Sequence, residues 1–587
     1  MTSNRLKSPG LKSIYASGLV GLLMVTMASC SSYATNTEEQ DLVWNRAGYT
    51  QNSPKWAYLR NDTADTFHLI SVENSDTLFT GQISNQVEYD SLSGDYISKL
   101  DFSEFDQAGS YKLNVPEHDI VSAPFFIGSQ AYHEELIPAL RSFYLQRCGT
   151  AIEDSDWQRR ICHINDGPFF NNRSETRNTT GGWHDAGDYN KFAVTTAVSA
   201  GLLMQLYELN PEFIGSISLD IPESYNDRPD LLDEVKWALD WLMRMQRDDG
   251  AVYFKVSEKQ WTGEFLPHHH QEVRYIFDVS SAATAGASAV FAQGARLFQE
   301  FDERYANRLL QASEKAWDWL AEHPEIYPEG GFRNPDGVQG GEYHDSNDRD
   351  ERMWAASELM KTTGIPVYQQ YIENNYSDLF TAHILLPLSW MNTGSLALAS
   401  LMGAEAEWKS NHVKAEITER IIENGDRLVA RVDSNPYRYI LTEGEFYWGS
   451  NSVALGYAVD LITAWRATGD LSYIHAAEHQ LHYILGRNPF GMAYVTSHRP
   501  GWVNRPYHQW VITSHMNKPI EGMLVGGPNN NSGMRISPSH NYPAKWYRDD
   551  SREYTVNETA INYTASYAYV LGFFSLPKTD HLITETQ

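Results

Sequence analysis

The chain has 587 residues, which is enough for more than one domain and a large core. Its 46 basic and 75 acidic residues give a net charge of −29, which argues against nucleic acid as a partner because phosphates need a basic surface. The hydrophobic share of 42% is typical of a globular protein, and the aromatic share of 13% is high. Aromatic rings stack on the apolar faces of sugars, so the composition is compatible with a carbohydrate cleft.

The first forty residues are expected to direct export. Basic residues precede an apolar run at 19–27, and two small residues are followed by Cys30. This pattern is typical of a signal peptide, and the cysteine resembles a bacterial lipoprotein cleavage site. We expect a signal at 1–30, a lipid on Cys30, a polar tether at 31–40 and an outer-membrane location. The alternatives are a plain secretory signal and a secreted or periplasmic protein. No later stretch is apolar enough to cross a bilayer, so membrane contact is expected only through the lipid.

The segment 41–128 reads as short alternating strands separated by turns. Examples are 66–72, 78–80 and 109–115. Strands at this spacing predict a β-sandwich. Nothing in the segment indicates chemistry, so we expect a structural brace, with a sugar-binding module as the alternative.

After residue 131 the apolar residues recur with helical periodicity about a dozen times. The clearest helices are predicted at 231–246, 279–297, 305–320, 353–361, 417–428, 453–467, 472–485 and 560–574. Long loops rich in Gly, Pro, Trp and Tyr separate them. Periodicity alone predicts many helices, and the pattern suits a toroid of helical hairpins with its chemistry in the loops.

The segment 180–192, TGGWHDAGDYNKF, contains two carboxylates three residues apart. An apolar-periodic run follows, so Asp188 is predicted to lie at the N-cap of a helix. The partial positive charge of the helix N-terminus would keep this carboxylate ionised and able to accept a proton from water. The alternative is that Asp188 only caps the helix and Asp185 only begins a turn.

A third acid, Glu558, lies in the segment 547–560, YRDDSREYTVNETA. It is predicted to begin an apolar helix beside Tyr554, where desolvation would raise its pKa and keep it protonated. The alternative is a first-turn Glu that only interacts with the helix dipole.

In this segment and in four others, the chain resembles glycoside hydrolase family 9, the inverting β-glucanases. The other segments are the Asp-Ala-Gly-Asp motif, 447–452 (YWGSNS), 485–492 (LGRNPFGM) and 524–529 (LVGGPN), in family order from about residue 130 to 575. The resemblance implies a mainly α protein with an (α/α)6 barrel at 130–577. Residues 108–111 (AGSY) likewise resemble the immunoglobulin-like modules that precede some catalytic domains of this family, which implies such a module at 41–128.

The resemblance also implies roles for the three acids. Glu558 would be the general acid, Asp188 the general base, and Asp185 a second group that holds the attacking water. Inverting hydrolysis needs an acid and a base about 6.5–9.5 Å apart, which leaves room for water between them.

Substrate contacts are predicted from aromatic and His residues on or near expected loops. They are Trp354, Tyr447, Trp448, Trp502, Tyr507, His508 and Tyr554. One departure from the family concerns 507–510, where without a gap Tyr507 and Gln509 stand in place of sugar-contacting His and Arg. A shift of one residue restores His508 but still leaves Trp510 in place of Arg. Another is Thr564 in place of Asn. Both departures put a standard endo-cellulase specificity in doubt.

Two Cys and two His lie within a short stretch of loops. If Cys30 carries lipid, only Cys148 and Cys162 remain, and an exported protein can join them in a disulfide. However, His163 follows Cys162 and His184 precedes Asp185, so the four side chains offer a tetrahedral zinc set. The same pattern occurs in family members with the immunoglobulin-like module. We favour structural zinc, because four protein ligands leave no open position.

A calcium loop is predicted on weaker grounds. Ser346, Asn347, Asp350 and Glu351 are spaced like the oxygen ligands of several family members. A further Asp expected after Trp390 is Met391 here, and a hard cation needs six or more oxygens. The alternative is an acidic helix start.

Together these observations predict a monomeric, inverting glycosidase that cleaves β-1,4-glucosidic bonds in cellulose-like glucans or their oligosaccharides, in the manner of an endoglucanase. One alternative is an exo-acting β-glucosidase or glucosaminidase of the same family. Another is a catalytically silent, polysaccharide-binding surface lipoprotein.

Overall fold

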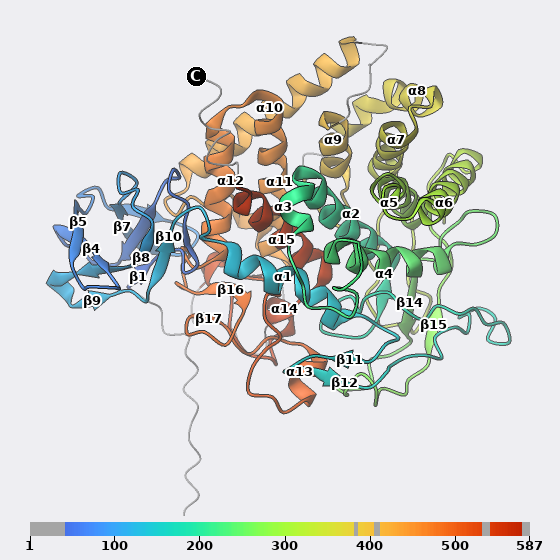
Figure 1. Ribbon diagram of the computed structural model, residues 1–587, viewed down its shortest axis with the longest axis horizontal. Coiled ribbons are helices and arrows are strands. Elements are labelled where there is room, and N and C mark those ends of the chain that lie inside the picture. Colours follow the sequence, from blue (N-terminus) through green and yellow to red (C-terminus); the bar gives the residue numbers. More distant parts are fainter. Residues whose placement is uncertain (1–40, 381–385, 404–410, 531–533, 535–540, 578–587) are drawn as a thin grey trace, which may run out of the picture. The chain divides into compact units, whose positions relative to one another are not determined.

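The structure is a computed structural model, and it describes residues 41–380, 386–403, 411–530, 534 and 541–577 (Figure 1). The predicted signal, Cys30 and the tether therefore lie outside the described residues. Within the described part of the chain, no helix combines the length and the apolar character needed to cross a membrane.

The N-terminal residues form a sandwich of two sheets, in which all strand pairs are antiparallel except the parallel pair β2–β10. One sheet has the order β1-β3-β7-β6 and the other β2-β10-β8-β4-β5, with β9 beside β8. Alternate residues of β4 and β8 point into a shared apolar core, which is why these segments alternate in sequence. The strands are β1 Leu42–Val43, β2 Gly48–Tyr49, β3 Trp56–Arg60, β4 Thr66–Ser71, β5 Thr77–Gln82, β6 Glu88–Asp90, β7 Asp95–Asp101, β8 Gly109–Val115, β9 Ile120–Val121 and β10 Phe125–Ile127.

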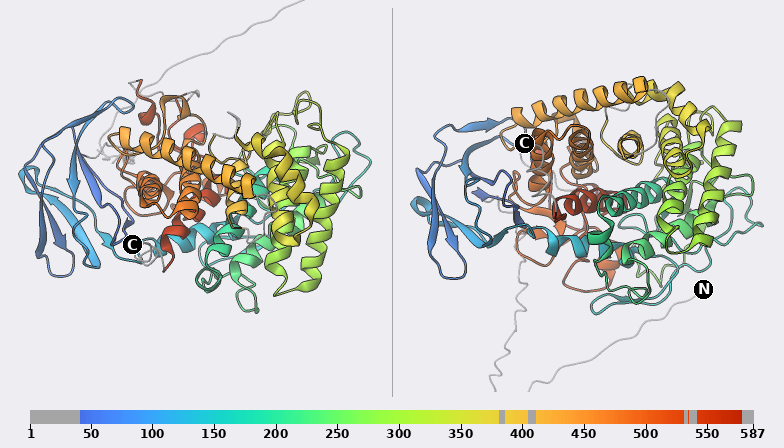
Figure 2. Two further views of the ribbon diagram at one scale, coloured as in Figure 1. Left: turned by 90° about the horizontal axis from the view of Figure 1, so that it is seen from above. Right: turned by 45° about the horizontal axis from the view of Figure 1, so that its top comes forward.

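The remaining chain is built on helices joined by long loops (Figures 1 and 2). The longer helices are α1 His133–Gln146, α2 Ala193–Leu209, α4 Asp230–Met245, α5 Ser281–Phe298, α6 Glu303–Glu322, α7 Arg349–Thr363, α8 Pro366–Asn375, α9 Gly394–Met402, α10 Asn411–Ser434, α11 Ser450–Thr468, α12 Leu471–Ile484 and α15 Ile561–Ser575. Three shorter ones are α3 Pro211–Gly215, α13 Gln509–Thr513 and α14 Tyr554–Asn557. All eight helices singled out from periodicity are present.

The helices form two concentric rings. Neighbour contacts close an inner ring in the order α2, α5, α7, α9, α11 and α15, and α15 returns to α2. The outer helices α1, α4, α6, α8, α10 and α12 alternate with the inner ones along the chain. Helices α2 and α15 are buried on nearly all sides, whereas α4 and α6 bury one face, as expected for an (α/α)6 barrel.

Short strands occur in the loops of the helical part. They are β11 Ile152–Glu153, β12 Gln158–Arg159, β13 Lys191–Phe192, β14 Lys255–Glu258, β15 Arg274–Ile276, β16 Ala493–Thr496 and β17 Trp502–Val503. Strand β13 follows the Asp185–Asp188 loop directly and precedes α2, and its pairing in the sheet β13-β14-β15 anchors the N-terminal end of α2.

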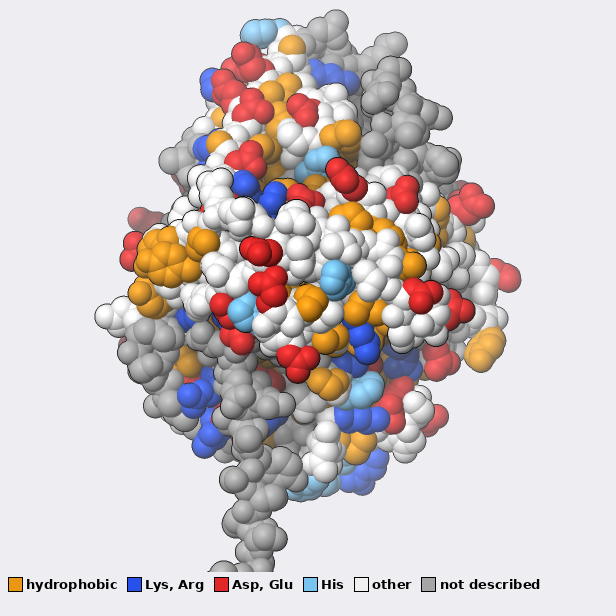
Figure 3. Space-filling view, turned by 90° about the vertical axis from the view of Figure 1, so that its left-hand side faces the viewer, with side chains coloured by type: hydrophobic (Ala, Val, Ile, Leu, Met, Phe, Trp, Pro, Cys, Tyr) orange, Lys and Arg blue, Asp and Glu red, His pale blue; other side chains and the backbone are white. Residues whose placement is uncertain are grey.

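Buried polar contacts attach the sandwich to the helical part. The Asp95 carboxylate accepts hydrogen bonds from the Tyr437 hydroxyl at 2.8 Å and from the Lys545 ammonium at 2.7 Å. Asp90 accepts one from the Tyr439 hydroxyl at 2.9 Å. Figure 3 shows the face on the sandwich side, where acidic side chains are scattered among hydrophobic ones. The large negative charge is therefore dispersed on this face, as expected for a solvated surface.

Candidate active site

The two aspartates lie on a loop that folds back on itself before β13. The Asp185 N–H donates to the Asn190 carbonyl at 2.8 Å. Asp188 accepts from the Asn190 backbone N–H at 3.2 Å and from its side-chain amide at 2.6 Å, which is an Asx turn. The predicted N-cap role of Asp188 is wrong, because α2 begins only at Ala193 and its N-cap is Phe192. The strand pairing of Lys191–Phe192 with β14 separates the aspartate from the helix.

Glu558 lies between two helices. It is the C-cap residue of α14, with extended backbone angles (φ −78°, ψ 138°), and Ala560 is the N-cap of α15. The prediction that Glu558 begins a helix is therefore wrong, because a short extended segment separates it from α15. The alternative of a first-turn Glu is wrong for the same reason.

Backbone contacts bring the aspartate loop and the Glu558 segment together. Isolated bridges pair Ala186 with Ala560 and Tyr507 with Glu558. The Ile561 N–H donates to the Asp185 carbonyl at 2.8 Å, and the Gly526 N–H donates to the Glu558 carbonyl at 3.0 Å. Segments far apart in sequence thus converge on one site, held by main-chain hydrogen bonds.

Gly187 explains why the motif contains glycine. A Cβ at this position would lie 2.5 Å from the carbonyl oxygen of Tyr507, a distance that backbone atoms cannot relieve. The Gly187 carbonyl also accepts from the Gln509 N–H at 2.7 Å. Only a residue without a side chain allows the aspartate loop to pack this closely against the 507–509 segment.

Burial and mutual repulsion raise the pKa values of all three acids. Burial raises the pKa of Asp185 to about 7. Burial and then the charge of Glu258 raise the pKa of Asp188 to about 6. For Glu558, burial followed by the charges of Asp188 and Asp185 holds the pKa well above its ordinary range. Three neighbouring carboxylates would repel one another, so ionising all three costs free energy. Glu558 therefore retains a proton when the aspartates are charged.

Four partners of the aspartates were not foreseen from the sequence. The Tyr343 hydroxyl donates to Asp185 at 2.7 Å, and the Thr195 hydroxyl also donates to this carboxylate. Asn190 holds Asp188, and Glu258 raises its pKa. The backbone contact of Asn190 was detectable, because an Asp side chain commonly accepts from the backbone N–H two residues later in an Asx turn. Tyr343 lies on the loop before α7, and no local pattern links it to Asp185.

The aromatic predictions divide into exposed and buried groups. Tyr447, Trp448 and Tyr554 are 38%, 45% and 41% exposed, and the ring centroids of Trp448 and Tyr554 are 5.7 Å apart. Tyr507 is partly buried, with its ring 5.9 Å from that of Tyr554. Trp448, Tyr554 and Tyr507 thus form an accessible row beside Glu558, and Tyr447 precedes Trp448 in the chain.

Three predicted substrate contacts are wrong because the side chains are buried. Trp354 is fully buried on α7, where its ring fills the space beside Gly201 of α2. Trp502 is covered by the Arg499 guanidinium, 3.8 Å from its ring centroid. His508 is 1% exposed, and its Nε2 lies 3.2 Å from the side-chain oxygen of Gln146. Burial lowers the pKa of His508 to about 4, so this ring stays neutral in the interior.

The four predicted zinc ligands converge. One ligand atom from each of Cys148, Cys162, His163 and His184 lies within 4.8 Å of the others. The two cysteines are unpaired and buried, so the structure does not contain the alternative disulfide. The Cys148 N–H donates to the Gly182 carbonyl at 2.7 Å, and the His184 N–H donates to the Gln146 carbonyl at 2.8 Å.

The surroundings of this cluster act in opposite directions on its two thiols, because the hydrogen bond with Cys148 and burial raise the pKa of Cys162 well above its ordinary value. Burial opposes ionisation of Cys148, but a hydrogen bond with Cys162 and the charges of Lys191 and Arg274 lower its pKa well below the ordinary value. Burial also holds the pKa of His184 far below its usual range, so the imidazole is neutral and able to bind metal. The donor set of two sulfurs and two nitrogens is one that zinc prefers.

The predicted calcium loop brings buried acids together at the start of α7. Asp350 accepts from the Thr393 N–H at 2.7 Å and from the Asn347 amide at 3.1 Å. Both carboxylate oxygens of Glu351 are buried without a hydrogen-bond partner among the described residues. Burial and then the charge of Asp350 raise the pKa of Glu351 well above its ordinary value. Ser346 is exposed, and calcium binding here stays a prediction.

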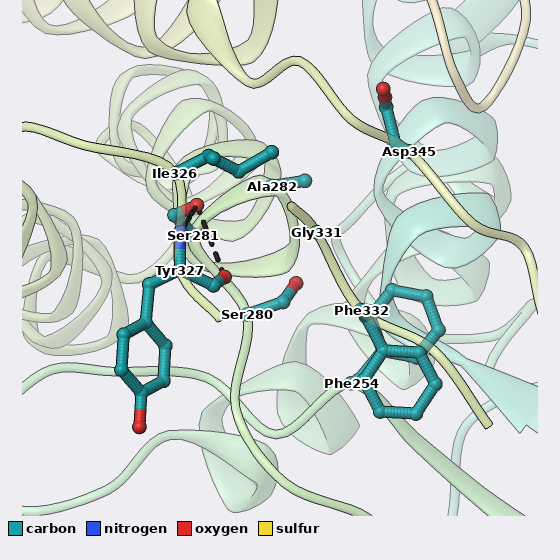
Figure 4. Close-up of a pocket in the computed structure, with 9 residues that line it drawn as sticks. All are labelled: Phe254, Ser280, Ser281, Ala282, Ile326, Tyr327, Gly331, Phe332 and Asp345. Carbon is teal, nitrogen blue, oxygen red and sulfur yellow. Dashed lines mark hydrogen bonds between the residues drawn. The ribbon is translucent and has the colours of Figure 1, made fainter. Parts of the chain in front are cut away.

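A small pocket lies beside this loop (Figure 4). Phe254 and Phe332 stack on one side of it with ring centroids 3.9 Å apart, and the Asp345 carboxylate points away from them. None of the predicted catalytic or substrate-binding residues lines this pocket.

Known proteins contain the same combination of a β-sandwich and a helical domain. The model of glycosyl hydrolase family 9 matches residues 132–571. The chain belongs to glycosyl hydrolase family 9. A cellulase N-terminal immunoglobulin-like domain matches residues 37–119, in agreement with the sandwich that precedes the barrel.

Several family 9 proteins are similar over nearly the whole chain. Endoglucanase D of Acetivibrio thermocellus is 29% identical over 96% of this chain and 87% of its own length. A xyloglucan-specific endo-β-1,4-glucanase of Bacteroides ovatus is 29% identical over 93% of this chain and 96% of its own length. The crystal structure of the family 9 endoglucanase J30 is 35% identical and matches with a TM-score of 0.83 over 90% of this chain and 99% of that one.

The departures from the family pattern have different structural settings. Gln509 is buried and its backbone N–H binds Gly187, so it does not replace an exposed sugar contact. Tyr507 remains beside Glu558 and borders the accessible row. Thr564 is buried and its hydroxyl accepts from the Leu524 N–H at 3.2 Å. Only Tyr507 among these family 9 departures changes the surface next to the acids.

Proposed function

We propose that the protein is an inverting glycosidase that hydrolyses internal β-1,4-glucosidic bonds of glucans and their oligosaccharides. The observation that carries this proposal is the convergence of Asp185, Asp188 and Glu558 at one site with pKa values raised to different extents. A glycosidase needs one carboxyl group that retains its proton and another that is ionised. The similarity to endoglucanases supports the choice of substrate.

In this mechanism Glu558 protonates the leaving oxygen. Its high pKa keeps the proton available. When Asp188 takes up a proton from water, its negative charge disappears, which lowers the pKa of Glu558 and favours transfer of the proton. Asp188 accepts a proton from the attacking water on the opposite face of the sugar. Asp185 orients the same water, and the Tyr343 hydroxyl fixes Asp185 by its hydrogen bond. Trp448 and Tyr554 supply rings on which neighbouring sugar units stack.

Substitutions and product analysis test these roles. Asp188→Ala and Glu558→Gln should each lower kcat by about 10²–10⁴-fold, because each removes a general acid or base. Asp185→Ala should be milder, since this residue positions water. Circular dichroism checks folding, and NMR of the first product reads the anomer. A β-anomer as first product would exclude inversion, and an Asp188 or Glu558 variant with half of the wild-type activity would exclude that residue from its role. Product lengths separate internal cleavage from release of single terminal sugars.

We further propose that Cys148, Cys162, His163 and His184 bind one structural zinc ion. Zinc would link the end of α1 to the loop that carries the two aspartates, without an open coordination position for substrate. Its binding free energy would then contribute to folding. The purified protein should contain about one zinc per chain, and Cys148→Ser should lower both zinc content and melting temperature. A metal-free protein with unchanged melting temperature would refute the site.

The lipid anchor is a separate proposal that the sequence alone supports. Cys30→Ala should abolish incorporation of radiolabelled fatty acid and release the protein from the membrane fraction. Incorporation that persists in the variant would refute Cys30 as the lipidation site.

A further inference from the structure

Strand β14 places Lys255 directly opposite Phe192, close to the aspartate loop. The two residues are partners in the β13–β14 pairing, and Phe192 is the N-cap of α2. The Lys255 side chain is fully buried, with its nitrogen 5.3 Å from the centroid of the Phe192 ring and 4.7 Å from that of Phe277. Aromatic faces attract a cation. The conventional hydrogen bonds of this amino group are made on another side.

The hydrogen-bond acceptors of Lys255 all belong to one loop segment, residues 334–343. The amino group donates to the Asn334 side-chain oxygen at 2.6 Å and to the Gly341 carbonyl at 2.8 Å. The Asn334 amide also donates to the Gly340 carbonyl at 2.6 Å. Burial lowers the pKa of Lys255 to about 7, but a neutral amine still has the two hydrogens that its two short bonds need. Lys255 therefore ties together the two ends of this segment.

Tyr343 follows Gly341 by two residues and reaches Asp185. Its hydroxyl donates to the Asp185 carboxylate at 2.7 Å. The backbone of Tyr343 has a φ of 45°, in the left-handed region that residues with a side chain seldom adopt. Such a conformation persists only where the surrounding contacts fix it. The hydrogen bonds of Lys255 and Asn334 supply such contacts immediately before the strained residue.

We propose that Lys255 is a positioning residue, which holds residues 334–343 in the conformation that presents the Tyr343 hydroxyl to Asp185. The proposal rests on the proposed glucanase function and deepens it. A buried amino group costs free energy that hydrogen bonds to neutral acceptors offset only in part, so an apolar residue of similar length should pack well in the same place. Methionine at position 255 should therefore preserve the fold and release the segment.

The kinetic test compares Lys255→Met with Lys259→Met on a soluble oligosaccharide. Lys255→Met should lower kcat about tenfold and change KM less than twofold, because Asp185 acts on the attacking water and not in substrate binding. Lys259→Met is the matched control and should keep kcat within twofold. It removes the same charge just after β14, but the Lys259 carbonyl, which accepts from the Gln339 N–H at 2.9 Å, is retained.

Combination with Tyr343→Phe shows whether Lys255 acts through the hydroxyl. In the Tyr343→Phe background, Lys255→Met should lower kcat less than twofold further, because the hydrogen bond that Lys255 positions is already absent. Asn334→Ala removes the acceptor of Lys255 and gives a second test if Lys255→Met does not fold. It should reproduce both the fall in kcat and the loss of that effect in the Tyr343→Phe background. Losses of kcat that multiply in the double variants would overturn the proposal.

Hydrogen exchange separates this proposal from the proposed function. The amides of residues 334–343 should exchange faster in Lys255→Met than in wild type or Lys259→Met, while circular dichroism stays unchanged. A wild type that cleaves no β-1,4-glucan would overturn the proposed function, and this inference with it. An active wild type, with unchanged kcat or unchanged exchange of this segment in Lys255→Met, would overturn the role of Lys255 alone.

Discussion

Replacing Tyr343 by Phe removes one hydrogen bond from Asp185 and leaves the packing intact. The Tyr343 ring contacts Phe192 at 4.5 Å and Trp390 at 5.0 Å between centroids, and a phenylalanine ring retains both contacts. The lost hydroxyl donates to the Asp185 carboxylate at 2.7 Å in a buried setting. A hydrogen bond to a charged group contributes about 1.5–3 kcal/mol.

The sign of the effect follows from the direction of the hydrogen bond. Burial raises the pKa of Asp185 to about 7, and the hydroxyl partly opposes this by stabilising the ionised form. Without the hydroxyl the pKa of Asp185 rises further, so the aspartate is protonated at a pH where the wild type is active. At about 1.4 kcal/mol per pH unit, the low-pH limb of kcat/KM should move upward by about 1–2 pH units.

The assay is the pH profile of kcat/KM on a soluble oligosaccharide, which reports groups of the free enzyme. Tyr563→Phe is the control, because the charge of Asp185 acts on Tyr563 but no hydrogen bond joins the two side chains. Its low-pH limb should move less than that of Tyr343→Phe. Superimposable limbs for wild type and Tyr343→Phe would refute the role of the hydroxyl in holding Asp185 ionised.

Two further predictions concern stability. The pKa of Asp188 is raised from 3.8 to about 6, so the stability due to its protonation is complete below 3.8 and is lost as pH rises through about 6. Asp188→Asn cannot ionise at this position, so its stability lacks this pH dependence. The unfolding free energy of the variant minus that of the wild type, measured by urea titration, should increase by on the order of 1–2 kcal/mol between pH 4 and pH 8. A difference that stays constant over this range would contradict the prediction. Asp95→Ala should lower the unfolding free energy by about 3–5 kcal/mol, because the buried Lys545 ammonium loses its carboxylate. Asp95→Asn retains an acceptor for Tyr437 and should lose less; equal losses would contradict the role of that hydrogen bond.

The helical part of the fold could be predicted well because its signal is local. Helices such as α2 and α15 are apolar on all sides, and the outer helices are apolar on one face. Closure of the inner ring, with α15 against α2, involves the two ends of the helical domain. No periodicity shows that contact, and only the resemblance to a family implied it.

The errors at the site arise from contacts between distant segments. Asp188 precedes a helical pattern, but pairing of Lys191 with Val256 of β14 turns the residues after it into a strand. Trp354 was placed near a loop, yet the absence of a side chain at Gly201 creates the space that buries it. Tyr343 reaches Asp185 from the loop before α7, so no spacing rule could have identified it.

The positions of the acids depend on the main chain more than on helix ends. Asp185 is flanked by a backbone hydrogen bond to Ile561 and, three residues earlier in the chain, by the hydrogen bond between Cys148 and Gly182. Asp188 is held by Asn190, which itself accepts a hydrogen bond from the Glu258 N–H at the end of β14. Each attachment fixes a different residue of one short loop, so the loop has little freedom left to lose when substrate binds. Such preorganisation lowers the reorganisation needed in the transition state, so the cluster of Cys148, Cys162, His163 and His184 and the strand β14, which hold no catalytic acid themselves, should both influence the reaction.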